Sequence, residues 1–262
     1  LLGAWIWYVP LLSIPVLCLI SLLLVVFLVR EPKDREAAKP LGEFISAVKK
    51  VLKQKGRWLY AIFAIGCISM FLLFGVLFYL SEQLEVKHGL DGVMKGLVLA
   101  IPLAALCLAS YVTGKKIGDD KKLMKWSGVA GLILSTGALF GIGFLNNIYF
   151  VIACLIICGA GIGIVLPSSD ALITEGVDKV MRGTITSIYS SMRFIGVSAG
   201  APVMSLLMKA GHMTMFFVIS GVSLVAVILL LIMVKPESGP GGAIKPKEPE
   251  KRTKTVRALH HS

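Results

Sequence analysis

The chain has few charged residues for its length. Charged residues make up 16% of its 262 residues and hydrophobic residues 56%, whereas a soluble globular domain holds about 25% charged and 45–50% apolar residues. The apolar residues gather in stretches of about 20, the length that crosses a bilayer core of roughly 30 Å. This composition argues against an ordinary soluble domain and predicts a chain that folds in lipid.

Cysteine is scarce, and the loops contain none. The five cysteines all lie inside apolar stretches: Cys18, Cys67, Cys107, Cys154 and Cys158. That placement gives neither a disulfide framework nor a metal-ligand pattern. No apolar stretch holds paired acids or a Ser-His pair, so the sequence does not predict an enzyme and implies no metal or cofactor.

The net charge of +12 raises the question of a nucleic-acid partner. Nucleic-acid readers carry their basic residues on one face of a soluble module, often with stacking aromatics. Here the basic residues lie between or after the apolar stretches. We therefore expect a lipid bilayer rather than nucleic acid as the partner.

Seven apolar stretches are long enough to span a membrane, and several have Trp or Tyr near an end, at the expected headgroup depth. Helices are the form expected, because lipid leaves an unpaired strand edge unsatisfied. We predict an all-α polytopic membrane protein with seven transmembrane helices. The spans are Tyr8–Val29, Trp58–Ser81, Val93–Thr113, Trp126–Leu145, Phe150–Ile173, Thr184–Met208 and Met215–Val234.

The distribution of Lys and Arg predicts the orientation. Of the 27 basic residues, 23 lie in the segments 30–57, 114–125, 174–183 and 235–262. The alternate loops and their helix ends hold three, Lys87, Lys95 and Lys209. Positively charged loops stay in the cytoplasm, so we expect the N-terminus outside and the C-terminus inside a bacterial cytoplasmic membrane.

The loops suggest four segments. Residues 1–29 read as the last helix of an N-terminal half that this sequence does not contain. Residues 30–57 form a basic cytoplasmic linker with an amphipathic helix, and residues 58–234 form a six-helix half. Residues 235–262 form a basic tail whose composition predicts disorder. One leftover helix followed by six is expected if the sequence starts just before the sixth of twelve helices.

Arg193 is the basic residue that falls inside a predicted span. At about 1.5 Å per residue from Thr184, it lies roughly 13–14 Å into the membrane. A charge at that depth costs at least about 2.5 kcal/mol, so it faces a cavity or a partner. Small and polar residues share its helix face, namely Thr186, Tyr189, Ser190 and Gly200. The sequence allows two interpretations, a substrate or gating role and a structural ion pair.

Asp170 is the acidic residue that lies well inside a span, near the cytoplasmic end of the fifth. It is a second candidate for the substrate cavity or the gate. Snorkelling to water is the alternative, and pairing with Arg193 requires the two side chains to overcome a difference in depth.

The second span is rich in aromatic residues, with Met70 and Phe74 on one face. Flexible Met and aromatic faces suit hydrophobic ligands, and packing against lipid or protein is the alternative. Gly159, Gly163 and Pro167 in the fifth span and Pro102 in the third mark predicted kinks. The Gly-x-Gly-x-Gly run of the fifth span follows no strand, so it does not predict a dinucleotide site.

Three stretches together resemble the C-terminal half of the major facilitator superfamily, most closely the twelve-helix bacterial drug–proton antiporters. They are Arg30-Glu31-Pro32, the run from Gly159 to Pro167, and the run from Gly183 to Gly196. The resemblance covers roughly residues 8–235. It implies six helices in two inverted triplets and alternating access.

Two motifs of that superfamily have echoes here. The cytoplasmic loop Gly-x-x-x-Asp-Arg-x-Gly-Arg-Arg is similar to the segment containing Gly114, Asp119, Asp120, Lys121 and Lys122, although the acid comes one position late. The resemblance implies a cytoplasmic gate loop, and an ordinary positive turn is the alternative.

The antiporter motif Gly-x-x-x-Gly-Pro is similar to Gly196, Gly200 and Pro202, with one residue inserted before the proline. Small residues four apart let helices approach closely, and Pro202 cannot continue the helical hydrogen-bond ladder. Tight packing and a hinge are both possible roles.

The resemblance implies proton-coupled efflux of small hydrophobic or amphipathic compounds by a secondary active transporter, with protons as the coupling ion. Two alternatives remain, a seven-helix receptor and a non-transporting membrane interaction subunit. A receptor predicts an outer disulfide or a Lys in the last span, and the sequence has neither.

Overall fold

The computed structural model describes residues 9–28, 42, 46, 49, 56–118, 120–145 and 147–234. Their regular structure is helical, and the prediction of an all-α chain is confirmed over these residues. The helices are α1 (Val9–Leu28), α3 (Gly56–His88), α4 (Gly92–Lys116), α5 (Lys121–Ile142), α6 (Ile148–Gly176), α7 (Lys179–Met208) and α8 (His212–Met233).

Each predicted span corresponds to one of these helices. Six of them, α3 to α8, are long and apolar enough to cross a membrane, while the apolar stretch found in α1, Ile14–Leu28, is shorter. Most helices are longer than their apolar cores. For example, α3 continues beyond its predicted end at Ser81 to His88, because backbone hydrogen bonding does not stop where hydrophobicity stops.

Polar N-caps determine where two helices begin. The Asp120 side chain accepts hydrogen bonds from the backbone N–H groups of Lys122, at 2.8 Å, and Leu123. Asn147 accepts one from the N–H of Tyr149 at 3.0 Å. Such caps satisfy N–H groups that a helix leaves free at its first turn.

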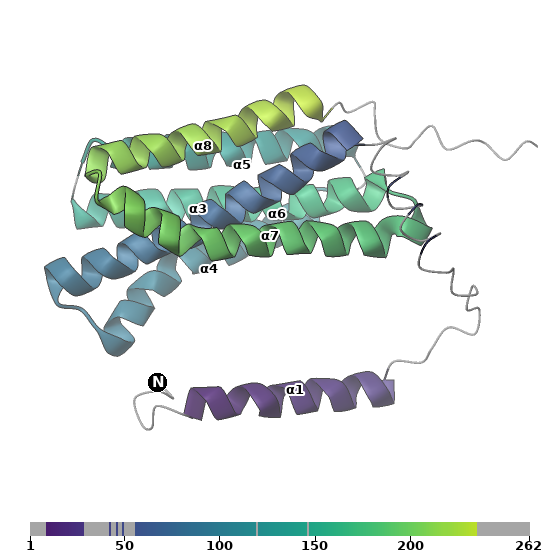
Figure 1. The fold of residues 1–262 in the computed structure, drawn as a ribbon, viewed down its shortest axis with the longest axis horizontal. Coiled ribbons are helices and arrows are strands. Elements are labelled where there is room, and N and C mark those ends of the chain that lie inside the picture. Colours follow the sequence, from purple (N-terminus) through teal and green to yellow (C-terminus); the bar gives the residue numbers. More distant parts are fainter. Residues whose placement is uncertain are drawn as a thin grey trace, which may run out of the picture.

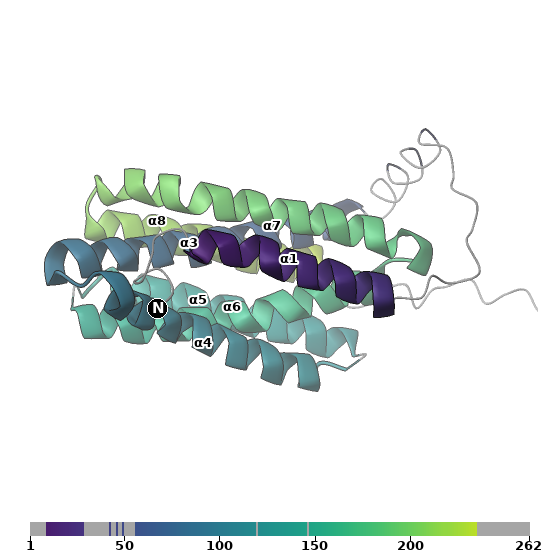
Figure 2. The same cartoon turned by 90° about the horizontal axis from the view of Figure 1, so that it is seen from below.

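The six helices α3 to α8 form one bundle (Figures 1 and 2). The most extensive contacts join α3 to α7, α5 to α6 and α4 to α6, followed by α5 to α8 and α3 to α8. Exchanging the triplet α3–α5 with the triplet α6–α8 converts the α3–α7 pair into the α6–α4 pair. The bundle thus has the pairing expected of two repeated triplets.

Helix α1 lies apart from this bundle in Figure 1, on the side of α7 and α4. All of its described side chains are exposed. On the opposite side of the bundle, α5 and α8 lie together.

Paired glycines bring the backbones of two helix pairs close together. On α7, a Cβ added to Gly196 would overlap the carbonyl oxygen of Cys67 in α3, and one added to Gly200 would lie 2.9 Å from the nitrogen of Gly75. On α6, a Cβ at Gly159 would lie 2.5 Å from the carbonyl oxygen of Pro102 in α4. Gly163 is blocked in the same way by the carbonyl of Leu106.

Pro167 leaves a free carbonyl inside α6, and a neighbouring helix satisfies it. Proline has no N–H, so the carbonyl of Gly163, four residues earlier, loses its usual helical donor. The Ser110 hydroxyl of α4 donates to this carbonyl at 2.8 Å. A hydrogen bond between helices therefore replaces the missing one, as lipid-embedded backbone requires.

Several expected features lie outside the described residues. Within the linker 30–55 only Gly42, Ser46 and Lys49 are described, so the amphipathic helix is not. The tail from Lys235 and the gate-loop residue Asp119 are likewise not described.

Candidate transport site

Arg193 and Asp170 lie against each other between α7 and α6. Arg193 Nη1 is 3.9 Å from Asp170 Oδ1, and the exposed fractions of the two side chains are 26% and 50%. Counting residues along straight helices placed the two at different depths. A long arginine side chain can extend along its helix, and this reach allows the pair to form.

The Arg193 guanidinium also lies near an aromatic ring. Its Cζ is 5.6 Å from the centre of the Tyr189 ring, one helical turn earlier on α7. A cation within about 6 Å of a ring face is attracted by its quadrupole. The arginine therefore has two partners, a carboxylate from α6 and a ring from its own helix.

Tyr189 does not line an open cavity, contrary to the helix face that the sequence suggested. Its side chain is fully buried, and its ring fills the space above Gly66 of α3, where a Cβ would overlap the ring. Gly200 is buried against α3 as well. The predicted polar face of α7 therefore does not form one surface. Tyr189 and Gly200 pack into the bundle, whereas Thr186 is exposed and Ser190 is half-buried.

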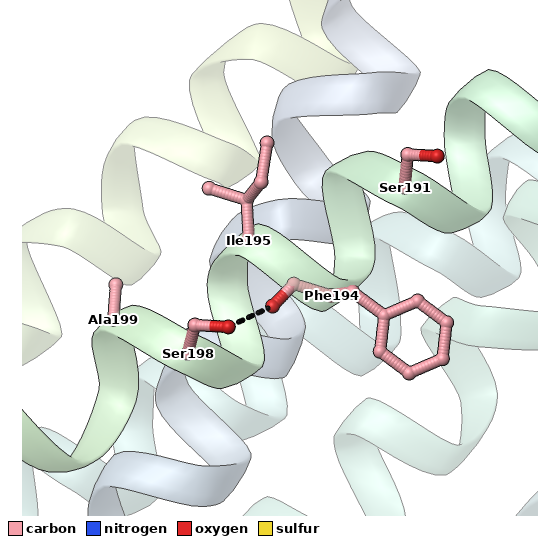
Figure 3. Close-up of a pocket in the computed structure, with 5 residues that line it drawn as sticks. All are labelled: Ser191, Phe194, Ile195, Ser198 and Ala199. Carbon is pink, nitrogen blue, oxygen red and sulfur yellow. Dashed lines mark hydrogen bonds between the residues drawn. The ribbon is translucent and has the colours of Figure 1, made fainter.

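The other side of α7 is open. A shallow depression of about 600 Å³ is lined by Ser191, Phe194, Ile195, Ser198 and Ala199, all from this one helix (Figure 3). The serines bond to their own helix: Ser198 donates to the carbonyl of Phe194 at 2.9 Å and Ser191 to that of Ser187 at 3.0 Å. This face is thus mostly apolar, and the hydroxyls of its two serines are satisfied locally.

The aromatic face of α3 is only partly open. Phe74 is 41% exposed, whereas Met70 is half-buried and packs against the core cluster. Phe74 is therefore the better placed of the two to touch a ligand.

The predicted glycines and prolines all lie inside helices. Gly159 and Gly163 face α4, Gly196 and Gly200 face α3, and the prolines Pro102, Pro167 and Pro202 are helix-internal. The contacts place the glycines at helix–helix packing positions. A hinge role remains a prediction.

The described part of the gate loop is a helix boundary. Gly114 lies in the last turn of α4, and Lys121 and Lys122 begin α5 behind the Asp120 cap. These contacts give Asp120 a capping role, and any gating role is still a prediction.

Sequence reasoning missed several polar side chains that join helices, among them Ser110, Lys125 and His212. Ser110 donates to Gly163, as described above, and Lys125 Nζ donates to the carbonyl of Leu231 at 3.0 Å, near the C-terminus of α8. His212 lies 2.9 Å from the Tyr79 hydroxyl through Nδ1 and 2.8 Å from the carbonyl of Ile142 through Nε2. Because a carbonyl only accepts, Nε2 carries the proton in this arrangement.

Of these three, only Ser110 carried a signal in the sequence, because it is a polar residue in an apolar span that also holds a proline. The partners of Lys125 and His212 depend on which helix ends meet.

Comparison with known proteins gives one family and two named relatives. The sequence profile of the Major Facilitator Superfamily matches residues 1–201 and 125–261. The chain is 48% identical over 234 residues to the "Bacillibactin exporter" of Bacillus subtilis (strain 168), covering 89% of this chain and 58% of that protein. It is 28% identical over 233 residues to the "Multidrug efflux protein YfmO" of the same organism, covering 88% of this chain and 56% of that protein. The chain spans little more than half the length of these relatives.

Proposed function

Because the chain belongs to the Major Facilitator Superfamily, we propose that it forms the C-terminal half of a twelve-helix transporter that exports small amphipathic compounds. Both named relatives are exporters by their descriptions. We place the protein in a bacterial cytoplasmic membrane, with the C-terminus of this chain in the cytoplasm.

The Arg193–Asp170 pair is the observation that carries the proposal. It joins α6 to α7, which otherwise make few contacts. Charges inside a bundle are costly and mark substrate or ion pathways. A pair that is partly exposed can exchange one partner for another, as a transport cycle requires.

The coupling step follows from the chemistry of the pair. When Asp170 is ionised, it holds the guanidinium of Arg193. The substrate binds from the cytoplasm while Asp170 is ionised, with its hydrogen-bonding groups against the carboxylate and the guanidinium. When Asp170 takes up a proton from outside, the carboxyl group no longer accepts those hydrogen bonds and the substrate is released. Release of the proton into the cytoplasm then restores the pair. This exchange couples one proton to one conformational cycle.

The opposing wall of the cavity comes from the N-terminal half in this proposal. The buried residues of α7 lie on one helix face, and in α4 only Pro102 and Thr113 are buried. Both helices thus have long unpartnered surfaces, and alternating access works by rocking one half against the other. We expect this chain without the N-terminal half not to transport.

For the substrate we propose compounds of the bacillibactin type, because the relative named for that compound is 48% identical. The test uses the complete protein in a Bacillus subtilis strain that lacks its own bacillibactin exporter. We expect bacillibactin in the medium to return to the level of the parent strain. Unchanged secretion together with normal membrane insertion would contradict the substrate. If an amphipathic dye is also retained by the cells, the proposal of efflux fails as a whole.

The role of the pair is tested by charge variants of the same protein. Arg193→Ala is expected to abolish export and leave membrane insertion intact, because one costly charge is removed. Arg193→Lys should retain part of the activity, since Lys keeps the charge without the planar fork of donors. Lys209→Ala, at the outer end of the same helix, is the matched control and should export normally. Normal export by Arg193→Ala would show that the pair is structural only.

Proton coupling has its own measurement. Asp170→Asn can neither take up nor release a proton, so export driven by a pH gradient should stop and the binding of bacillibactin should no longer depend on pH. If this variant still responds to the gradient as the parent does, Asp170 is not the coupling group. A protein that binds the compound and exports none of it in any variant would favour the alternative of a non-transporting subunit.

A further inference from the structure

A groove runs between α5 and α8, on the side of the bundle opposite α1 (Figure 1), and none of its lining residues belongs to α6 or α7, the helices that carry the Arg193–Asp170 pair. Its volume is about 500 Å³, within the range of roughly 300–1,000 Å³ that is typical of ligand sites. On both helices the lining residues are mostly apolar: Ile133, Thr136, Gly137, Phe140, Phe217, Ser220, Gly221, Leu224 and Val227.

Two glycines leave the groove open. Nothing in the described chain lies within 4 Å of a Cβ built at Gly137 or Gly221. In this they differ from Gly131, also on α5, where a Cβ would lie 2.5 Å from the carbonyl oxygen of Gly161. Glycine inside a helix is unfavourable relative to alanine. Packing within the chain therefore explains Gly131 but does not explain Gly137 or Gly221.

The polar atoms of the groove are already bonded. Thr136 Oγ1 lies 2.8 Å from the carbonyl of Leu132 and 2.7 Å from Ser223 Oγ. Ser220 donates to the carbonyl of Phe217 at 3.0 Å. The groove thus offers an occupant apolar contact and no free hydrogen-bonding group, which suits a hydrocarbon chain better than a polar ligand.

The length of the groove and the aromatic rings at one of its ends also suit a hydrocarbon chain. On α8 the lining runs from Phe217 to Val227, about 15 Å at 1.5 Å per residue, which is half of the roughly 30 Å hydrocarbon core. At the end of the groove nearest the C-terminus of α5, Phe140 and Phe217 meet with ring centres 5.2 Å apart, and Phe144 contacts both. A second copy of the chain is a poor fit, because nine residues line the groove and a stable protein interface takes about 20–30 residues a side.

We propose that this groove binds one acyl chain of a membrane phospholipid. The site lies on two helices that are long and apolar enough to cross a membrane, and its occupant is distinct from the transported compound. A phospholipid held between α5 and α8 would exchange with the bilayer more slowly than the surrounding lipids do.

The proposal is tested by filling the groove in the complete protein. Gly137→Leu and Gly221→Leu place a side chain in the open space, and Val225→Phe adds bulk to an exposed position of α8 outside the lining. The purified proteins are compared by native mass spectrometry, with a phosphatidylglycerol that carries a photoreactive group on its acyl chain. We expect one retained lipid and cross-links to Ile133 or Leu224 in the parent and in Val225→Phe. Both signals should be lost in each leucine variant.

The remaining outcomes contradict the proposal. Equal lipid retention and cross-linking in the leucine variants and the parent would mean that the groove has no specific occupant. A dimer in the parent that dissociates in the leucine variants would assign the groove to a second copy. Thermal unfolding of each variant shows whether the bundle is intact, and Gly221→Ala provides a smaller filling that should weaken retention if the leucine variants do not fold.

Discussion

The α4–α6 contact and the α3–α7 contact occupy equivalent places in the two helix triplets. In both, a pair of glycines four residues apart lies against the backbone of the partner helix: Gly159 and Gly163 in one, Gly196 and Gly200 in the other. Beyond the glycines the contacts differ. The first adds a hydrogen bond from Ser110 to a carbonyl that Pro167 leaves free, whereas the second adds the buried ring of Tyr189 beside Arg193.

The difference between the two contacts separates the stability that comes from close backbone packing from the stability that comes from polar groups. Close approach of backbones gives dispersion contacts, and neither contact needs polar groups for that purpose. The serine compensates for the carbonyl of Gly163 that Pro167 leaves free in the first contact. In the other contact, the polar atoms of the ion pair lie at its edge, where they are partly exposed. The first contact is therefore closed by a buried hydrogen bond, whereas the second borders the ion pair to which the proposed transport step is assigned.

The largest expected effect is shared by the two contacts. Gly196→Val and Gly159→Val should each lower the free energy of unfolding by about 3 kcal/mol, because added side-chain atoms meet backbone that cannot move aside. Thermal unfolding in detergent measures the change. Gly183→Val, on an open part of α7, is the control and should change stability by less than about 0.5 kcal/mol. If the two substitutions changed the free energy of unfolding by different amounts, the α4–α6 and α3–α7 contacts would not be equivalent.

An intermediate effect is expected in the α4–α6 contact alone. Ser110→Ala should cost about 1–3 kcal/mol, because the Gly163 carbonyl is left without a donor inside the bundle. In the background of Pro167→Ala, which restores a backbone N–H four residues on, the same substitution should cost much less. A double-mutant cycle measures this coupling. If the costs simply add, Ser110 does not compensate for the proline.

The smallest effect is expected in the α3–α7 contact. The Tyr189 hydroxyl is buried and makes no hydrogen bond of normal geometry within the described residues. Tyr189→Phe should therefore change the free energy of unfolding by less than about 0.5 kcal/mol, since no bond is lost and the ring stays. A loss above about 1 kcal/mol in chemical or thermal unfolding would show that the hydroxyl has a partner, with the neighbouring Ser169 as the first to test.

The positions of the helices were predictable because lipid imposes one rule on every span. Stretches of about 20 apolar residues must form helices there, and the predicted spans all have counterparts. The partners of each helix were not predictable in the same way. Membrane helices are apolar on most faces, so periodicity does not show that α3 packs on α7.

Glycine shows the same limit at the level of single residues. Gly131 and Gly137 lie on one helix six positions apart, yet one touches the backbone of α6 and the other faces open space. The sequence does not distinguish them. The sequence leaves the Arg193–Asp170 pair open, because counting residues gives the depth of the Cα atom and not that of the guanidinium.

The pairing of α3 with α7 has a consequence for synthesis of the protein. Cys67 and Gly196, which face each other in the folded bundle, are 129 positions apart in the sequence. At about 5–20 residues per second the ribosome needs roughly 6–26 s to make the intervening chain. During that time α3 must remain in the bilayer without its main partner, held by the apolar character of its own side chains. The α3–α7 contact therefore forms late in biogenesis.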